Sequence, residues 1–295
     1  MRLLALFCVF LAFGARAETI AASTAGACRP GAKWTEPAQP RKIFGNTWYV
    51  GTCGLSAILV TSPQGHVLID GDVEDAAPLI EASIREAGFR LEDVRYILNS
   101  HEHYDHAGGI AKLQRDTHAT VAAREPAATA LESGHGDRSD PQFLSGKTFP
   151  PVANVRRIAD GDTISVGAAE LTAHATPGHT MGSTTWTWTA CEDGRCLHIV
   201  YADSLTAISD DSFRFSDESA HPGLLDAFRR SIATIATLPC DILLSPHPDA
   251  SDLWHRLGPA ASAPLIDAGA CRRYATTAEK NLDERIAREK TASAP

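Results

Sequence analysis

Hydrophobic and polar residues along this 295-residue chain follow two periods, one typical of strands and one typical of helices. Short runs rich in branched and aromatic residues, bounded by Gly and Pro, predict strands. Runs whose apolar residues recur every three or four positions predict amphipathic helices. Strands are expected at 47–51, 56–62, 66–72, 94–99, 119–123, 154–159, 163–166, 169–176, 183–190, 196–202 and 240–245. Helices are expected at 76–87, 107–116, 125–133, 223–238 and 272–290.

The order of these elements predicts an α/β fold built on two layers of sheet. Strands, a helix, a strand, a polar motif and another helix follow one another in the first half, and the second half repeats this style. Such an order favours two sheets packed together with helices outside. Residues 133–151 have no clean period, and a polar connection of this length is often a functional loop.

The first residues predict an export signal rather than part of the fold. Arg2 precedes the short apolar run 3–13, and Ala-Arg-Ala at 15–17 fits the small-residue cleavage pattern. We expect a signal peptide over residues 1–17 and a single mature domain over 18–295 in the periplasm. A buried N-terminal helix is the alternative interpretation. No later segment is long and apolar enough to span a bilayer, so no membrane association is expected once the signal is removed.

Six cysteines remain when the signal, which contains Cys8, is removed. An even number in an exported chain predicts disulfides, with buried free thiols as the alternative. Two of the six flank the turn sequence Glu-Asp-Gly-Arg and so can bridge locally. For the others, order along the chain favours joining neighbours. The expected pairs are Cys28 with Cys53, Cys191 with Cys196, and Cys240 with Cys271.

Composition and charge narrow the classes of partner. The chain has 44% hydrophobic and 21% charged residues, which is ordinary for a globular protein. Its formal net charge is −9, and no cluster of Lys and Arg is dense enough to hold a phosphate backbone. Nucleic acid is therefore not an expected substrate. Nothing in the chain demands an oligomer, so we expect a monomer.

Side chains that bind metals follow three of the predicted strands. The sequence HEHYDH (residues 101–106) comes directly after one strand, and His179 and His247 each follow another. The ends of strands are where α/β proteins build their sites. In an extended segment His101 and His103 point to the same side, so their imidazoles can share one ion.

Asp105 and His106 lie where the chain turns into the next predicted helix, and so point at a second spot nearby. Two clusters of ligands imply two metal ions, and imidazole with a single carboxylate suits zinc best. A lone histidine such as His179 is more often structural. The pattern H-x-H-x-D-H between a strand and a helix is a far more specific signal.

On these motifs the sequence resembles the metallo-β-lactamase superfamily. The match is carried by HEHYDH, by TPGHT with His179, by YADS with Asp203 and Ser204, and by SPHP with His247. The resemblance implies an α/β fold, the αβ/βα four-layer sandwich, in which two mixed sheets pack together with helices on their outer faces. Position 103 is His where the redox di-iron relatives carry Glu, so the chain resembles the zinc hydrolases.

Subclass B3 is the most similar branch, because YADSLT stands where a metal-binding cysteine would otherwise follow the strand at 196–202. This resemblance implies two Zn²⁺ per chain and hydrolysis of the cyclic amide of β-lactam antibiotics, which confers antibiotic resistance. Bound zinc lowers the pKa of a water to about 7, and Asp105 would aim the resulting hydroxide. The implied ligands are His101, His103 and His179 for the first ion, and Asp105, His106 and His247 for the second.

The resemblance also implies contacts with a small-molecule β-lactam substrate. Ser204 and Thr206 would hold the carboxylate of the antibiotic directly or through water, and Gln142 in the 133–151 loop would reach the substrate. Trp48 would wall the groove, with packing in the core as the alternative.

Two further acids are expected near the site. Asp70, at the end of the strand 66–72, would support the geometry of the ligands. Asp203 corresponds to an Asp that bridges two metals in glyoxalase-type relatives, but Ser204 follows it as in the B3 pattern. We expect that Asp203 is not a ligand.

Another hydrolase of the same fold, such as a lactonase or a glyoxalase II-like thioesterase, is the main alternative function. A glutathione-type thioesterase is expected to carry a basic C-terminal region for its anionic substrate, and here only Arg272 and Arg273 stand out. A periplasmic zinc-binding protein without turnover would need the same histidines, but it has no use for an open coordination position.

Overall fold

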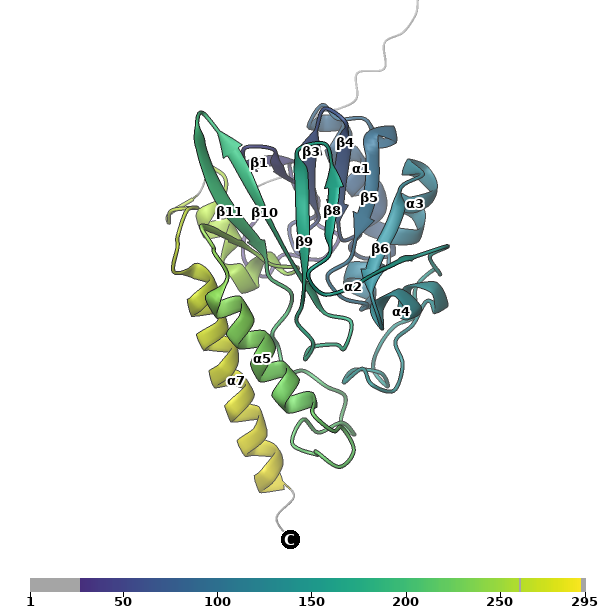
Figure 1. Cartoon of the computed structure of the whole chain (residues 1–295), viewed down its shortest axis with the longest axis vertical. Helices are drawn as coiled ribbons and strands as arrows, with labels where there is room; N and C mark the ends of the chain where they lie inside the picture. The colour runs from purple at the N-terminus through teal and green to yellow at the C-terminus, as the bar shows by residue number, and fades with distance from the viewer. Residues whose placement is uncertain (1–26, 260, 293–295) are drawn as a thin grey trace, which may run out of the picture.

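The described strands of the computed structural model form two β-sheets that pack face to face (Figure 1). The description covers residues 27–292 except residue 260, so the predicted signal peptide with its Cys8 lies outside it. The first sheet has the order β1 (Arg41–Phe44), β2 (Thr47–Tyr49), β3 (Ile58–Ser62), β4 (Gly65–Ile69), β5 (Val94–Leu98), β6 (Thr120–Arg124) and β7 (Arg156–Ile158). The second has the order β12 (Ile242–Leu244), β11 (Arg195–Tyr201), β10 (Thr184–Glu192), β9 (Ala169–Ala175) and β8 (Thr163–Val166).

Both sheets are mixed. The first is antiparallel from β1 to β4 and parallel from β4 to β7. The second is antiparallel except for its pair β11 and β12, which is parallel. Parallel neighbours place their carboxyl ends at the same edge, and that is where the polar motifs emerge.

Helices cover the outer face of each sheet, which gives four layers (Figure 1). Along β4, Val67 and Ile69 pack between the sheets while Leu68 packs under the helices, as the period of two in a strand requires. The first sheet carries α1 (Ala77–Glu86), α2 (Tyr104–Ala107), α3 (Ile110–Thr117) and α4 (Ala127–Ser133), and the second carries α5 (Leu224–Thr237) and α7 (Ala270–Ala292). The short α6 (Leu253–Arg256) packs into the layer between the sheets.

The predicted fold class is confirmed. Every strand and helix expected from the periodicity is present, with ends that differ by a few residues. The pattern missed β1, α2 and α6, because four residues are too few to establish a period.

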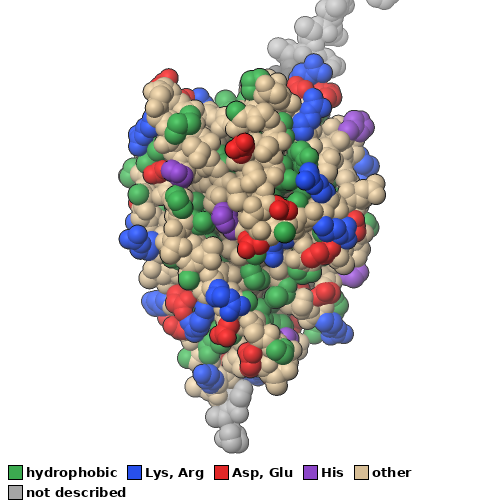
Figure 2. Space-filling model, viewed as in Figure 1, with side chains coloured by type: hydrophobic (Ala, Val, Ile, Leu, Met, Phe, Trp, Pro, Cys, Tyr) green, Lys and Arg blue, Asp and Glu red, His purple; other side chains and the backbone are tan. Residues whose placement is uncertain are grey.

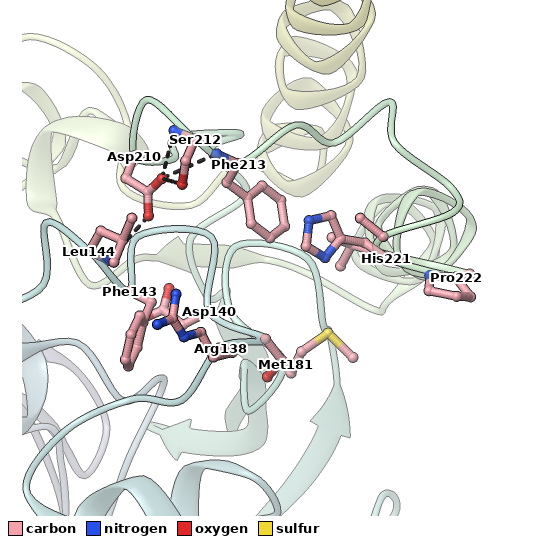
Figure 3. Close-up of a pocket in the computed structure, with 14 residues that line it drawn as sticks. Arg138, Asp140, Phe143, Leu144, Met181, Asp210, Ser212, Phe213, His221 and Pro222 are labelled. Atoms are coloured by element: carbon pink, nitrogen blue, oxygen red, sulfur yellow. Dashed lines mark hydrogen bonds between the residues drawn. The ribbon is translucent and has the colours of Figure 1, made fainter.

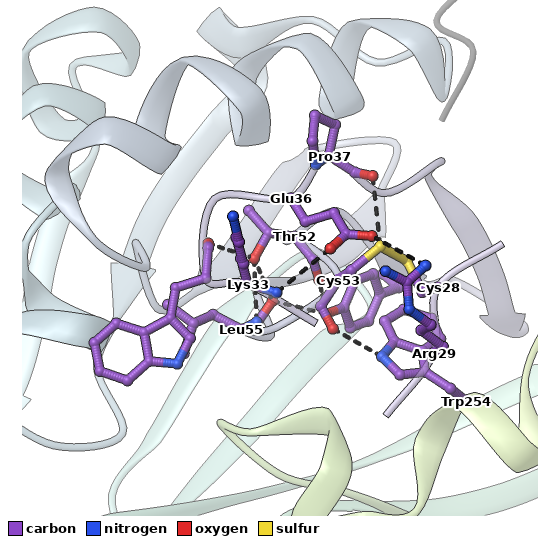
Figure 4. Close-up of a disulfide and its surroundings, with 11 residues drawn as sticks. Cys28, Arg29, Lys33, Glu36, Pro37, Thr52, Cys53, Leu55 and Trp254 are labelled. Carbon is purple, nitrogen blue, oxygen red and sulfur yellow. Dashed lines mark hydrogen bonds and ion pairs between the residues drawn. A yellow bond between two sulfur atoms is a disulfide. The ribbon is translucent and has the colours of Figure 1, made fainter. Parts of the chain in front are cut away.

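Three disulfides join the six cysteines of the described chain: Cys28–Cys53, Cys191–Cys196 and Cys240–Cys271. The first ties the N-terminal segment to the loop after β2 (Figure 4). Cys53 also donates its backbone N–H to the carbonyl of Glu36, and its own carbonyl accepts a hydrogen bond from the Trp254 indole, each at 2.8 Å. The segment that contains Trp34 is thereby held against the body of the protein.

No helix in the described part of the chain has the length and apolar character that crossing a membrane requires. On the face in Figure 2, Lys and Arg side chains are interspersed with Asp and Glu and do not gather into one patch.

We expect Trp186→Ala to lower the free energy of unfolding by about 3–5 kcal/mol, because removing a buried indole leaves a cavity. Trp186 is fully buried between the sheets and donates a hydrogen bond to the carbonyl of Asn99 at 3.1 Å. The matched control, Trp34→Ala, removes an indole that is 44% exposed and should change the value by about 0.5 kcal/mol or less. Urea denaturation of the oxidised protein measures both variants. Equal losses would contradict the placement of Trp186 in the core.

Candidate metal centre

The buried carboxylate of Asp70 joins the ends of strands from both sheets. Asp70 lies just beyond β4, where the chain takes a φ of 65°. Its Oδ1 accepts a hydrogen bond from the backbone N–H of Ser100, and its Oδ2 accepts others from the hydroxyls of Ser100 and Tyr201, all at 2.7 Å. Ser100 follows β5 in the first sheet, and Tyr201 ends β11 in the second. The carboxylate therefore fixes three strand ends relative to one another.

Three imidazoles converge beside these strand ends. His101 and His103 come from the segment after β5, and His179 comes from the turn between β9 and β10. Their ligand atoms lie within 4.8 Å of one another. The backbone N–H of Thr184 donates to the carbonyl of Ser100 at 2.7 Å, which joins the two segments directly. Sequence reasoning predicted this set, and the structure brings its members together.

Hydrogen bonds orient two of these rings through the ring nitrogen that faces away from the other imidazoles, which we call the outer nitrogen. His101 Nδ1 lies 2.8 Å from Oδ1 of Asp203, and His179 Nδ1 lies 2.9 Å from the carbonyl oxygen of Thr206. Each bond leaves Nε2 turned toward the other imidazoles. His101 Nε2 is buried and has no hydrogen-bond partner among the described residues. Leaving such an atom unsatisfied costs about 1–3 kcal/mol, so its position fits a metal ligand.

Asp105, His106 and His247 form a second group with a regular geometry. His106 Nε2, His247 Nε2 and Asp105 Oδ2 lie 3.3 Å from one another in all three pairs. Ligand atoms around a tetrahedral zinc ion, at about 2.0–2.1 Å from it, are about 3.3 Å apart. The three donor atoms therefore match one face of a zinc tetrahedron.

The two groups adjoin. His101, Asp105 and His106 form a further set whose ligand atoms lie within 4.8 Å of one another. The ring centroids of His101 and His106 are 4.4 Å apart. Asp105 consequently lies where the two groups meet. The arrangement can hold two metal ions side by side, and its nitrogen and carboxylate donors are those that zinc prefers.

Buried acids surround the two donor groups. Asp70, Asp72 and Asp203 are inaccessible to solvent. In the described part of the chain, the ion pairs of Asp70, Asp105 and Asp203 are all with histidines. Burial, and then the charge of Asp70, raise the pKa of Asp72 to about 8 against the opposing effect of His106. A divalent cation bound beside these carboxyl groups would favour their ionised form.

The pKa values of three of these histidines are shifted, two downward and one upward. Burial and the neighbouring His103 lower the pKa of His179 to about 3, and burial followed by His106 lowers that of His101 well below its usual value. Both rings are therefore neutral, which is the form that binds metals. Burial also acts to lower the pKa of His106, but the Asp105 carboxylate outweighs it and raises the value to about 9.

A groove of about 680 Å³ opens over both groups. Trp34, Gln142, Thr206 and Ile208 are among its lining residues. Trp34 and Ile208 are 44% and 52% exposed, so the groove has an apolar rim. Its volume is within the range of sites for drug-sized molecules.

The residues expected to contact substrate differ in their placement. Gln142 and Thr206 line the groove, whereas Ser204 is buried and is not among the described lining residues. Trp48 does not wall the groove, because it packs edge-on against Phe89, with ring centroids 5.3 Å apart, under the helices of the first sheet. That expectation was wrong, and the alternative of core packing describes the residue.

Two residues of the site escaped sequence reasoning. Trp34 provides the indole at the groove, with its ring centroid 6.2 Å from that of His247. It lies in a Pro-rich connector without periodicity, so no local pattern pointed to it. Asp140 lies 3.1 Å from His103 Nε2. The length and polarity of the 133–151 loop was the only sign that it contained a functional residue.

An αβ/βα sandwich with two adjoining groups of metal donors at one edge of its sheets defines a class of metal-binding hydrolases. The model of the metallo-beta-lactamase superfamily matches residues 50–187. MEM-A1, a subclass B3 metallo-β-lactamase from a soil metagenome library, is 48% identical with a TM-score of 0.85, and the match covers 88% of this chain and 100% of that one. MIM-1 from Novosphingobium pentaromativorans is 49% identical with a TM-score of 0.85, covering 91% and 98%.

This chain belongs to the metallo-β-lactamase superfamily, as the motif HEHYDH predicted. A curated relative with a different activity is the hydroxyacylglutathione hydrolase of Rhodopseudomonas palustris (strain HaA2), which is 30% identical over 150 residues. That match covers 51% of this chain and 48% of the relative, so the chain spans about half the length of the curated relatives it matches.

We expect Asp105→Asn to lower the pKa of His106 in the metal-free protein, because burial is then opposed only by the smaller effects of Asp70 and Asp203. Since the folded pKa of about 9 exceeds the ordinary 6.5, the pair stabilises the metal-free fold fully below pH 6.5 and loses this effect as pH rises through 9. Titration of the ring by two-dimensional NMR measures the pKa, with the exposed His198 as internal control. An unchanged pKa would show that Asp105 is not its cause.

Proposed function

We propose that this protein is a zinc-dependent β-lactamase that opens the ring amide of penicillins, cephalosporins and carbapenems, and so confers antibiotic resistance. The observation that carries the proposal is the pair of adjoining donor groups at the floor of a groove that suits a drug-sized molecule. The similarity to subclass B3 structures extends over about nine-tenths of the chain and supports it.

We assign two zinc ions to the two donor groups. Bound zinc supplies a water of lowered pKa and an electrophile for the carbonyl oxygen of the substrate. The proposed ligands are His101, His103 and His179 for one ion, and Asp105, His106 and His247 for the other.

Asp105 is the proposed catalytic residue of the protein itself. Burial opposes its ionisation, but His106 and His247 hold the pKa of this carboxyl well below its usual range. Asp105 is therefore an ionised acceptor at neutral pH. Its position between the two donor groups lets it accept a hydrogen bond from the attacking water and orient that water toward the amide carbon.

Polar groups in the groove are suited to the substrate's carboxylate. His179 Nδ1–H donates to the carbonyl and hydroxyl oxygens of Thr206, so the hydroxyl hydrogen of Thr206 stays free to donate into the groove. The amide of Gln142 offers a second donor. The burial of Ser204 disfavours direct contact with substrate. Trp34 and Ile208 would pack against apolar substituents.

A lactonase or a thioesterase of the same fold remains the alternative function. The partial match to hydroxyacylglutathione hydrolases is its only support, and that match covers about half of each chain. The similarity to B3 structures covers far more of this chain at higher identity, which favours the β-lactamase.

We also propose that the protein works in the periplasm, after removal of residues 1–17, as a monomer. Three disulfides fit an oxidising compartment. Because the groove is built within one chain, the site needs no second copy.

The purified mature protein should hydrolyse a carbapenem, lose nearly all activity with a zinc chelator, and recover it when zinc is restored. His179→Ala should abolish hydrolysis, because it removes a proposed ligand, whereas the matched variant His198→Ala at an exposed position should retain it. Parallel assays with a lactone and a glutathione thioester separate the alternatives. Faster hydrolysis of either of these than of every β-lactam tested would overturn the proposal.

We expect Gln142→Ala to raise KM for a carbapenem about 2- to 12-fold with little change in kcat, since one hydrogen bond made equally in the ground and transition states contributes about 0.5–1.5 kcal/mol. Steady-state kinetics measure both constants. Gln114→Ala serves as control, because Gln114 bonds to Ala153 on the surface, away from the groove. A fall in kcat with KM unchanged would assign Gln142 a different role.

A further inference from the structure

The loop between α4 and β7 forms a wall of the groove, yet cavities lie on both of its sides. The groove of about 680 Å³ lies on one side. A second cavity, of about 630 Å³, is lined by Arg138, Met181, Phe213 and His221 (Figure 3). Phe143 lines both spaces. The middle of this wall therefore has little close packing of apolar side chains toward either cavity.

Hydrogen bonds anchor the loop. At its base, the N–H of Phe149 donates to the carbonyl of Gly134 at 2.9 Å. Near its tip, Leu144 N–H donates to Asp210 Oδ2 at 3.1 Å, and Asp210 N–H donates to the carbonyl of Pro141 at 2.9 Å. None of these three bonds involves a metal donor.

One side chain of the loop does reach the metal centre. Asp140 is only 5% exposed, and its Oδ1 accepts hydrogen bonds from His103 Nε2 at 3.1 Å and from the backbone N–H of Gln142 at 2.8 Å. A single carboxylate oxygen thus connects a proposed zinc ligand with Gln142, a residue that lines the groove.

The bond to the Asp140 carboxylate favours the tautomer of His103 that carries its proton on Nε2. With Asp140 accepting from Nε2–H, Nδ1 keeps its lone pair. His101 and His179 have the opposite orientation, since their Nδ1 atoms are held and their Nε2 atoms are free.

We propose that Asp140 is a positioning residue that couples zinc binding at His103 to the position of the groove wall. The inference rests on the proposed function, because it takes His103 as a zinc ligand. Asp140 holds the imidazole with Nδ1 presented to the ion. The bound ion in turn fixes the imidazole, and through it Asp140, Gln142 and the loop. Linkage requires that the coupling act equally in both directions.

Two measurements on the full mature protein test the coupling. Zinc affinity is measured by equilibrium competition with a chromophoric chelator, and hydrogen exchange of residues 134–149 is measured with and without zinc. Asp140→Ala should weaken zinc binding about 10- to 100-fold and abolish the protection that zinc gives to the loop amides. Asp140→Asn keeps an oxygen that can accept from His103 and should restore part of both.

Asp137→Ala is the matched control, because Asp137 lies in the same loop but bonds to Ser139 on the surface. It should leave zinc affinity and the zinc-dependent protection unchanged. Long-range ¹H–¹⁵N spectra of the histidine rings add a direct readout. In the metal-free protein, the Nε2–H form of His103 should dominate in the wild type and give way to a mixture of the two tautomers in Asp140→Ala.

Wild-type zinc affinity and unchanged loop protection in Asp140→Ala would overturn the inference, as would equal effects of Asp137→Ala. The failure of the proposed function is distinguishable from these results. A wild-type protein that binds no zinc would remove both proposals. A wild type that binds zinc and hydrolyses β-lactams, while the Asp140 variants behave like it, would remove only the coupling.

Discussion

Hydrogen bonds to one buried carboxylate, that of Asp70, connect the two sheets beneath the metal centre. The hydroxyl of Tyr201 in β11 shares its one hydrogen between Asp70 and the carbonyl oxygen of Ser56, which lies 2.9 Å away. The N–H of Ser56 donates in turn to the carbonyl of Pro246, immediately before His247. The carboxylate also lies 4.0 Å from His106 Nδ1. The segments that contain His106 and His247 are distant in sequence but are both held by this hydrogen-bond network. This allows their donor atoms to form the regular triangle with Asp105.

A second level of support comes from the residues that hold the outer nitrogens of the imidazoles. Asp203, Thr206 and Asp140 each accept a hydrogen bond from a different histidine. These bonds select the tautomer and leave the inner nitrogen to the ion. Burying several carboxylates without Lys or Arg partners is costly in the metal-free protein, and divalent ions offset that cost. Folding and metal binding are consequently linked.

The periodic pattern of the chain was enough to predict most of the strands and helices, the two packed sheets and the position of the motif HEHYDH after a strand. Local patterns contain little information about which side chains are in contact when they are distant in sequence. Trp48 and Trp34 show this. Trp48, in a clear strand, packs against the core under the helices, whereas Trp34, in an irregular connector tied by a disulfide, lines the groove. Asp140 likewise depends on where a non-periodic loop folds back.

Anomalous diffraction at the zinc edge from a crystal of the zinc-loaded protein tests the metal centre most directly. It should show two strong peaks, one bonded to His101 Nε2, His103 Nδ1 and His179 Nε2 and the other to Asp105 Oδ2, His106 Nε2 and His247 Nε2, at about 2.0–2.2 Å from each atom. A map without a peak at either position, or with zinc only at other residues, would contradict a paired zinc site at these strand ends.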